Sequence, residues 1–117
     1  MARRSGSAPA RPRRPGGDLV IRHIVSWKLA ATDAEARAAD AAGIRDRLEG
    51  LRGLVPALRL DVGIDLGATD GNWDVVLDSD FATEEDLAAY QVHPAHVEAA
   101  AFIRSVVASR SCVDYRA

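Results

Sequence analysis

Tyr90 and His96 are the side chains of this 117-residue sequence that best suit acid–base chemistry. They lie on either side of Pro94, at an expected break between two helices. A neutral imidazole can act as a general base or accept a hydrogen bond, and a phenol can donate one to a substrate carbonyl. The spacing therefore makes Tyr90 and His96 a candidate acid–base pair.

His23 is a third candidate, because it lies on the apolar side of an alternating segment near the N-terminus. If that side faces the helix break, His23, Tyr90 and His96 converge on one small pocket. An imidazole or phenol on an apolar face is, however, more often a packing or interface residue than a catalyst. Both interpretations of these three residues stay open here, whereas His93 is interpreted as a helix cap.

Metal and cofactor chemistry find no support in the residue pattern. The sequence has no glycine-rich phosphate loop, serine nucleophile elbow or metal-binding helix motif. His93 and His96 are three residues apart, but Pro94 lies between them and no nearby carboxylate completes a ligand set. We therefore expect no bound metal and no cofactor.

Cys112 is the only cysteine of the chain, which excludes an intrachain disulfide and a multi-cysteine metal site. It lies in a short alternating segment near the C-terminus, where we expect it to be a small buried apolar residue. This cysteine usage favours a reducing compartment, the cytoplasm.

Charge is divided unevenly along the chain. Residues 1–17 contain five arginines and no acidic residue, whereas the remainder has ten basic and 17 acidic residues, a net charge of −7. The basic segment is rich in Pro, Gly and Ser, so we expect a disordered tail over 1–17 and one domain over 18–117. An acidic domain repels phosphate groups, which argues against binding of nucleic acid or a membrane.

Four segments alternate between apolar and polar residues, a pattern that predicts half-buried strands. They cover residues 19–29, 58–66, 73–80 and 111–115. Turn-forming residues 67–72 join the second strand to the third, which predicts an antiparallel hairpin. Asp74, Asp78 and Asp80 fall on the polar side of the third strand, where we expect a solvated face.

An amphipathic helix is expected over residues 33–52, because apolar residues recur there every three or four positions. Thr32 or Asp33 can cap its start, and Gly53 can end it.

The second helical region is expected in two parts. Thr83 can cap a short helix over 83–91, and Pro94 then starts a longer helix through about residue 108. His96 lies in the first turn of this helix, on the side that must face the sheet. Burial and the helix dipole both disfavour a charged imidazole there.

The order of elements is therefore βαββαβ, an α+β arrangement in which helices cover one face of an antiparallel sheet. The other face carries apolar residues such as Val20, Ile24 and Val76 among polar ones. A second copy of the chain is the simplest cover for that face, so we expect a homodimer.

Three segments of the sequence resemble the stress-responsive dimeric α+β barrel (Dabb) domain family. They are Arg22–Leu29, Leu60–Gly63 and Asp86–His96, which contains the specific element Tyr-x-x-His-Pro-x-His, and Val113–Tyr115 fits as well. The resemblance covers about residues 19–116. It implies a ferredoxin-like protomer whose sheet pairs with that of a second protomer to close a barrel.

The family includes plant olivetolic acid cyclase, a cofactor-free polyketide cyclase. Its acid–base pair and its strand-one histidine match Tyr90, His96 and His23. The resemblance thus implies two possible functions: a stress-associated dimer that binds a small organic molecule, or a cofactor-free cyclase-like or isomerase-like enzyme.

Overall fold

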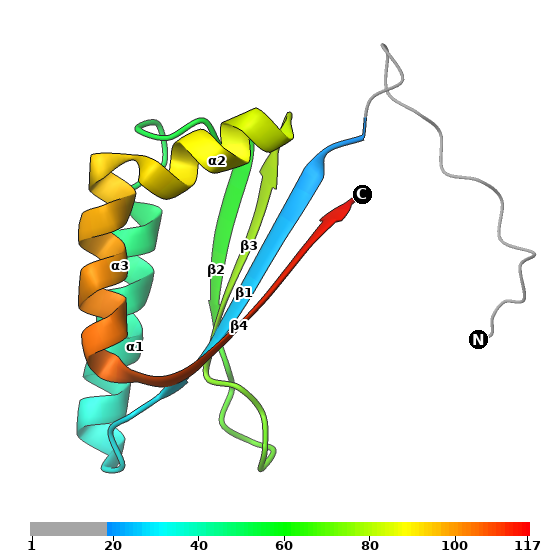
Figure 1. Cartoon of the computed structure of the whole chain (residues 1–117). Helices are drawn as coiled ribbons and strands as arrows, with labels where there is room; N and C mark the ends of the chain where they lie inside the picture. The colour runs from blue at the N-terminus through cyan, green and yellow to red at the C-terminus, as the bar shows by residue number, and fades with distance from the viewer. Residues whose placement is uncertain (1–18) are drawn as a thin grey trace, which may run out of the picture.

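The chain folds around strand β1 (Ile21–Leu29), an inner strand of a four-stranded antiparallel sheet with the order β2-β3-β1-β4 (Figure 1). The computed structural model describes residues 19–117, so the expected tail over 1–17 lies outside the described residues. The other elements are α1 (Ala34–Glu49), β2 (Arg59–Ile64), β3 (Val75–Phe81), α2 (Glu84–Val92), α3 (Pro94–Val106) and β4 (Val107–Arg116). The predicted βαββαβ order, with a broken second helix, is confirmed.

Helices α1, α2 and α3 all lie on one face of the sheet, and the opposite face is left uncovered (Figure 1). Along β1 every second residue is buried, as the sequence alternation predicts. The buried residues of β1 and β3 pack with the inner sides of the helices into one apolar core, which includes Val25, Ile44, Leu77, Phe81 and Ile103. No helix within residues 19–117 is long and apolar enough to cross a membrane.

Helix α1 begins where the sequence predicts and ends earlier. The Asp33 side chain accepts a hydrogen bond from the Ala36 backbone, which confirms Asp33 as the cap. The helix ends at Glu49 and not at the predicted residue 52, because Gly50 caps it and the chain turns before Gly53 adopts a left-handed φ of 81°. Gly43, inside the helix, lets α3 approach: a Cβ at this position would lie 2.9 Å from the Phe102 ring.

The predicted hairpin of β2 and β3 is confirmed, although both strands differ in length from the prediction. Strand β2 covers residues 59–64 and not the predicted 58–66. Leu58 and Leu66, which continue the alternating pattern at its two ends, are exposed. Strand β3 starts at Val75, because Asp74 is used instead to hold β1 and α1: its carboxylate accepts hydrogen bonds from the Leu29 backbone and from Arg37.

The expectation of a solvated acidic face on β3 is wrong for Asp80. This residue is only 7% exposed, because it lies between Arg22 of β1 and Arg59 of β2 and forms ion pairs with both. The hydrogen bonds from Arg22 and Arg59 lower the pKa of Asp80 to about 2. A row of alternating charges therefore crosses three strands on the uncovered face of the sheet.

Strand β4 lies at the edge of the sheet and pairs with β1 over its whole length. It begins at Val107, directly after α3 and four residues before the predicted start. The sequence does not predict this longer strand, because residues 108–111 show no alternation of apolar and polar side chains. Backbone hydrogen bonds, and not side-chain burial, hold this edge strand in the sheet. For the same reason Cys112 is exposed, so its predicted burial is wrong.

Candidate functional site

The break between α2 and α3 is built by His93. Its side-chain Nδ1 accepts a hydrogen bond of 3.0 Å from the Ala95 backbone and thereby caps α3, as the sequence predicts. Its backbone N–H donates to the carbonyl of Tyr90, and Pro94 follows in the first turn of α3. This break directs Tyr90, at the end of α2, and His96, at the start of α3, toward the same space under the helices.

Tyr90 is almost completely buried, at 1% exposure, on the sheet-facing side of α2. Its hydroxyl has no hydrogen-bond partner among residues 19–117. Burial raises the pKa of Tyr90 to about 12, so the phenol keeps its proton at neutral pH. A buried hydroxyl without a hydrogen-bond partner lowers the stability of the folded chain. The Tyr90 hydroxyl is therefore available to donate a hydrogen bond to a bound molecule.

His96 lies beside Tyr90, with ring centroids 4.4 Å apart. Its Nδ1 donates a hydrogen bond of 3.0 Å to the carbonyl oxygen of Gln91, since a carbonyl can only accept. The lone pair is therefore on Nε2. Burial lowers the pKa of His96, which favours the neutral imidazole that a general base requires.

His23 reaches the same region from the sheet. It is buried on the helix-facing side of β1, and its ring meets the Tyr90 ring edge-on at 6.0 Å between centroids. Its Nδ1 donates a hydrogen bond of 2.5 Å to the carboxylate of Asp114 on β4. No local sequence pattern indicates Asp114, because only the register of β1 with β4 places it opposite His23.

One cavity of about 260 Å³ between the helices and the sheet brings together His23, Tyr90 and His96. Its walls are otherwise mainly apolar: Val25, Trp27, Leu48, Leu77, Ala100, Ile103 and Val107. The convergence expected from the sequence is thus present in the structure, with His93 outside it as the cap.

Two arginines also line this cavity. Arg104 comes from the last turn of α3, and Arg110 comes from β4. Neither forms an ion pair with a carboxylate of residues 19–117. The cavity therefore has a positively charged margin, although the domain as a whole is acidic.

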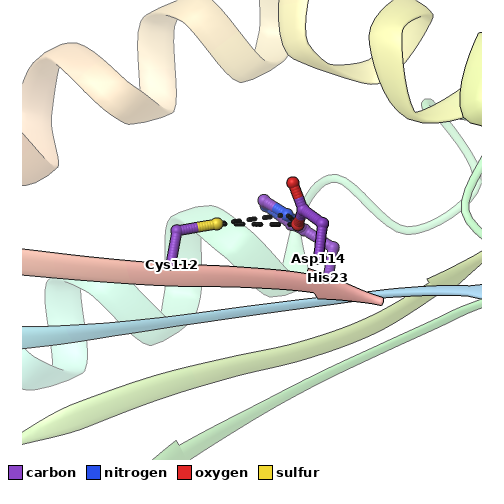
Figure 2. Close-up of side chains that lie close together, drawn as sticks. All are labelled: His23, Cys112 and Asp114. Carbon is purple, nitrogen blue, oxygen red and sulfur yellow. Dashed lines mark hydrogen bonds and ion pairs between the residues drawn. The ribbon is translucent and has the colours of Figure 1, made fainter. Parts of the chain in front are cut away.

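Beside the cavity, Cys112 lies next to the His23 and Asp114 pair (Figure 2). Its Sγ is 3.6 Å from the Nδ1 of His23 and 3.6 Å from a carboxylate oxygen of Asp114. Partial burial of its sulfur and the neighbouring Asp114 carboxylate raise the pKa of Cys112, so the free thiol is not activated as a nucleophile.

Known proteins share this architecture. A family model described as the Stress responsive A/B Barrel Domain (Dabb) matches residues 21–117. A dimeric ferredoxin-like protein of unknown function from Bacteroides fragilis is 28% identical, covering 84% of this chain and 96% of its own, with a TM-score of 0.76. A second, from Thermobifida fusca, is 28% identical, covering 86% of this chain and 92% of its own, with a TM-score of 0.72.

The same fold also occurs in a plant enzyme. Hydroxynitrile lyase from Passiflora edulis is 16% identical, covering 86% of this chain and 94% of its own, with a TM-score of 0.69. No curated protein matches the chain. The expected ferredoxin-like fold is confirmed, and close structural relatives are dimeric proteins.

Proposed function

Because this chain belongs to the stress-responsive A/B barrel domain family, we propose that it binds a small organic molecule in the cavity between its helices and its sheet. The main support for this proposal is the Tyr90 hydroxyl. It is buried without a hydrogen-bond partner among the described residues, and Tyr90 lines the cavity. A ligand that accepts a hydrogen bond from this hydroxyl removes the cost of leaving it unpaired.

The remaining walls define the kind of ligand. Most of the lining is aliphatic or aromatic, which suits an apolar body, and the Nε2 of His96 offers one hydrogen-bond acceptor. Arg104 and Arg110 at the margin suit an acidic group. The ligand class that fits is a small aromatic or alkyl acid with a polar group near Tyr90.

Trp27 provides a direct test of ligand binding. It lines the cavity at 5% exposure, and the chain has only one other tryptophan, Trp73, which lies outside the cavity. In the Trp73→Phe variant, titration with para-butylbenzoate is expected to change Trp27 fluorescence to saturation. The uncharged para-butylbenzyl alcohol is expected to bind about tenfold more weakly, since it lacks the charge for Arg104 and Arg110.

Matched variants on α3 locate the binding site. Ala100 lines the cavity, whereas Ala101 points outward and is exposed. Ala100→Leu fills part of the cavity and is expected to abolish the fluorescence change, while Ala101→Leu is expected to leave it intact. The absence of a saturable change, or an equal change in both variants, contradicts binding in this cavity.

Acid–base catalysis in the same cavity is a second candidate function. The specific observation in its favour is that a donor and an acceptor are both available at one place: the unpartnered hydroxyl of Tyr90 and the Nε2 of His96. His96 would remove a proton from a carbon next to a carbonyl, and the electron pair would move to the carbonyl oxygen. Tyr90 would donate a hydrogen bond to that oxygen until the proton returns.

Deuterium exchange distinguishes catalysis from binding alone. Para-acetylbenzoate has an acidic group, an aromatic body and a methyl ketone whose protons exchange through the enolate. In deuterated buffer, NMR is expected to show faster exchange with the protein than without it, and slow exchange with Tyr90→Phe or His96→Gln. Saturable binding with exchange at the buffer rate supports the binding function and excludes this enolisation.

A further inference from the structure

In contrast to the sequence expectation of no bound metal, we propose that His23, Cys112 and Asp114 form a binding site for a late first-row divalent metal ion such as Zn²⁺. The three side chains come from two neighbouring strands, β1 and β4, and point to the same side of the sheet (Figure 2). Each offers one ligand atom, and the three atoms lie within 4.8 Å of one another. The site adjoins the cavity but does not depend on the proposed ligand.

The strand register explains why these residues meet. His23 pairs with Asp114, and Val25 pairs with Cys112. Side chains two residues apart on a strand point to the same side, so Cys112 and Asp114 both reach the edge of the buried His23 ring. Three ligands therefore converge without any loop, on strands that backbone hydrogen bonds hold in place.

The distances suit tetrahedral coordination. Zinc bonds of about 2.0 Å to nitrogen and oxygen and about 2.3 Å to sulfur place sulfur about 3.5 Å from either of the other ligand atoms. The observed separations from the Cys112 Sγ are 3.6 Å to His23 and 3.6 Å to Asp114. The nitrogen and oxygen lie 2.5 Å apart and must separate to about 3.3 Å. The half-exposed side chain of Asp114 can make this movement.

The donor set selects the metal class. An imidazole nitrogen, a thiolate and a single carboxylate suit zinc, cobalt or nickel, whereas magnesium and calcium prefer sets of oxygen ligands. Binding releases the thiol proton to solvent and moves the ring hydrogen of His23 from Nδ1 to Nε2. Exposed Cys112 and Asp114 leave a fourth position open to water.

Cobalt provides a test with a readout specific to sulfur. A thiolate bound to Co²⁺ gives a charge-transfer absorption in the near ultraviolet, and Cys112 is the only cysteine that can produce it. We expect the reduced, untagged full chain, stripped of metal by a chelator, to develop this band and to saturate at one cobalt per chain. Zn²⁺ in equal amount is expected to displace the cobalt, and excess Mg²⁺ is not.

Variants assign the ligands. Cys112→Ser is expected to lose the band, and Asp114→Asn is expected to weaken cobalt binding at least about tenfold. Both residues are exposed, so neither change threatens the fold. His93→Asn is the matched control, because it changes a histidine outside the cluster and asparagine also caps helices. Absence of the band, or equal affinity in Asp114→Asn and the unmodified chain, overturns the proposal.

Discussion

His23 and Asp114 lie opposite each other in the pairing of β1 with β4, and the imidazole donates a hydrogen bond of 2.5 Å to the carboxylate. The His23 side chain is 3% exposed, whereas that of Asp114 is 42% exposed. The edge strand thus supplies the acceptor for a polar group buried in the core. His23 lines the cavity, so Asp114 of β4 also fixes the orientation of the His23 ring in the cavity wall.

Replacing Asp114 tests this relationship. Asp114→Ala leaves the buried Nδ1–H of His23 with only the Cys112 sulfur, 3.6 Å away, as a weak acceptor, and is expected to lower the free energy of unfolding by about 1 kcal/mol. Asp114→Asn keeps an oxygen acceptor and is expected to retain most of that stability. Urea unfolding of both variants measures the difference. Equal stability of Asp114→Ala and the unmodified chain contradicts the role assigned to this hydrogen bond.

Removing the Tyr90 hydroxyl is expected to stabilise the ligand-free protein. The hydroxyl is buried without a partner among residues 19–117, so Tyr90→Phe removes an uncompensated polar group and keeps the ring. The free energy of unfolding is expected to rise by about 1 kcal/mol. Tyr115→Phe is the control, because Tyr115 is exposed. A clear fall in stability of Tyr90→Phe indicates instead that the hydroxyl has a structural partner.

Stability is expected to fall below about pH 6.5 because of His96. Burial lowers the pKa of His96 in the folded chain, and the hydrogen bond to the Gln91 carbonyl partly opposes this shift. The nearby charges of His23, Arg104 and Arg110 lower the pKa further by smaller amounts. As the pH falls through the unfolded-state pKa of about 6.5, the unfolded chain binds a proton before the folded chain does. The folded state therefore loses stability until the pH drops below its own lowered pKa.

The comparison with His96→Gln isolates this titration. The difference in free energy of unfolding between the unmodified chain and His96→Gln, measured at one protein concentration from pH 8 to pH 5, is expected to shrink as the pH falls. A difference independent of pH means that His96 titrates alike in the folded and unfolded chains.

Asp80 is expected to be the most sensitive carboxylate of the uncovered sheet face. Asp80→Asn removes the charge between Arg22 and Arg59 and is expected to cost about 2 kcal/mol, measured by urea unfolding at neutral pH. Asp61 also pairs with Arg59, but it is exposed. Asp61→Asn is therefore expected to cost under about 1 kcal/mol, and equal losses in the two variants would refute the importance of burial.

The uncovered face is expected to be the homodimer interface. Ile24 lies on this face beside Asp78 and Val113. Ile24→Glu places a second negative charge next to Asp78 and is expected to shift the protein from dimer to monomer in light scattering. Leu54→Glu changes an apolar residue outside the sheet that is 60% exposed, and it is expected to leave the dimer intact. A dimer that survives Ile24→Glu uses another surface.

Local patterns in the sequence are enough to predict the elements and part of the site. Strand β1 shows the predicted alternation, and its pattern is local in the sequence. The same holds for the helix caps, which the structure places at Asp33, Thr83 and His93. Tyr90 and His96 could be paired for the same reason, because they lie six residues apart on either side of one helix break. Only the ends of elements were misplaced, where exposed residues carry no periodic signal.

Contacts between residues far apart in the chain depend on how the sheet and helices pack. Asp114 is 91 positions from His23 in the chain, and Asp80 lies between two arginines of other strands. The exposure of Cys112 likewise depends on its strand lying at the sheet edge. These relationships follow from strand order and register, which are set by the packing of the whole sheet against its helices. A local pattern cannot contain them, because the same alternating strand could pair with any neighbour.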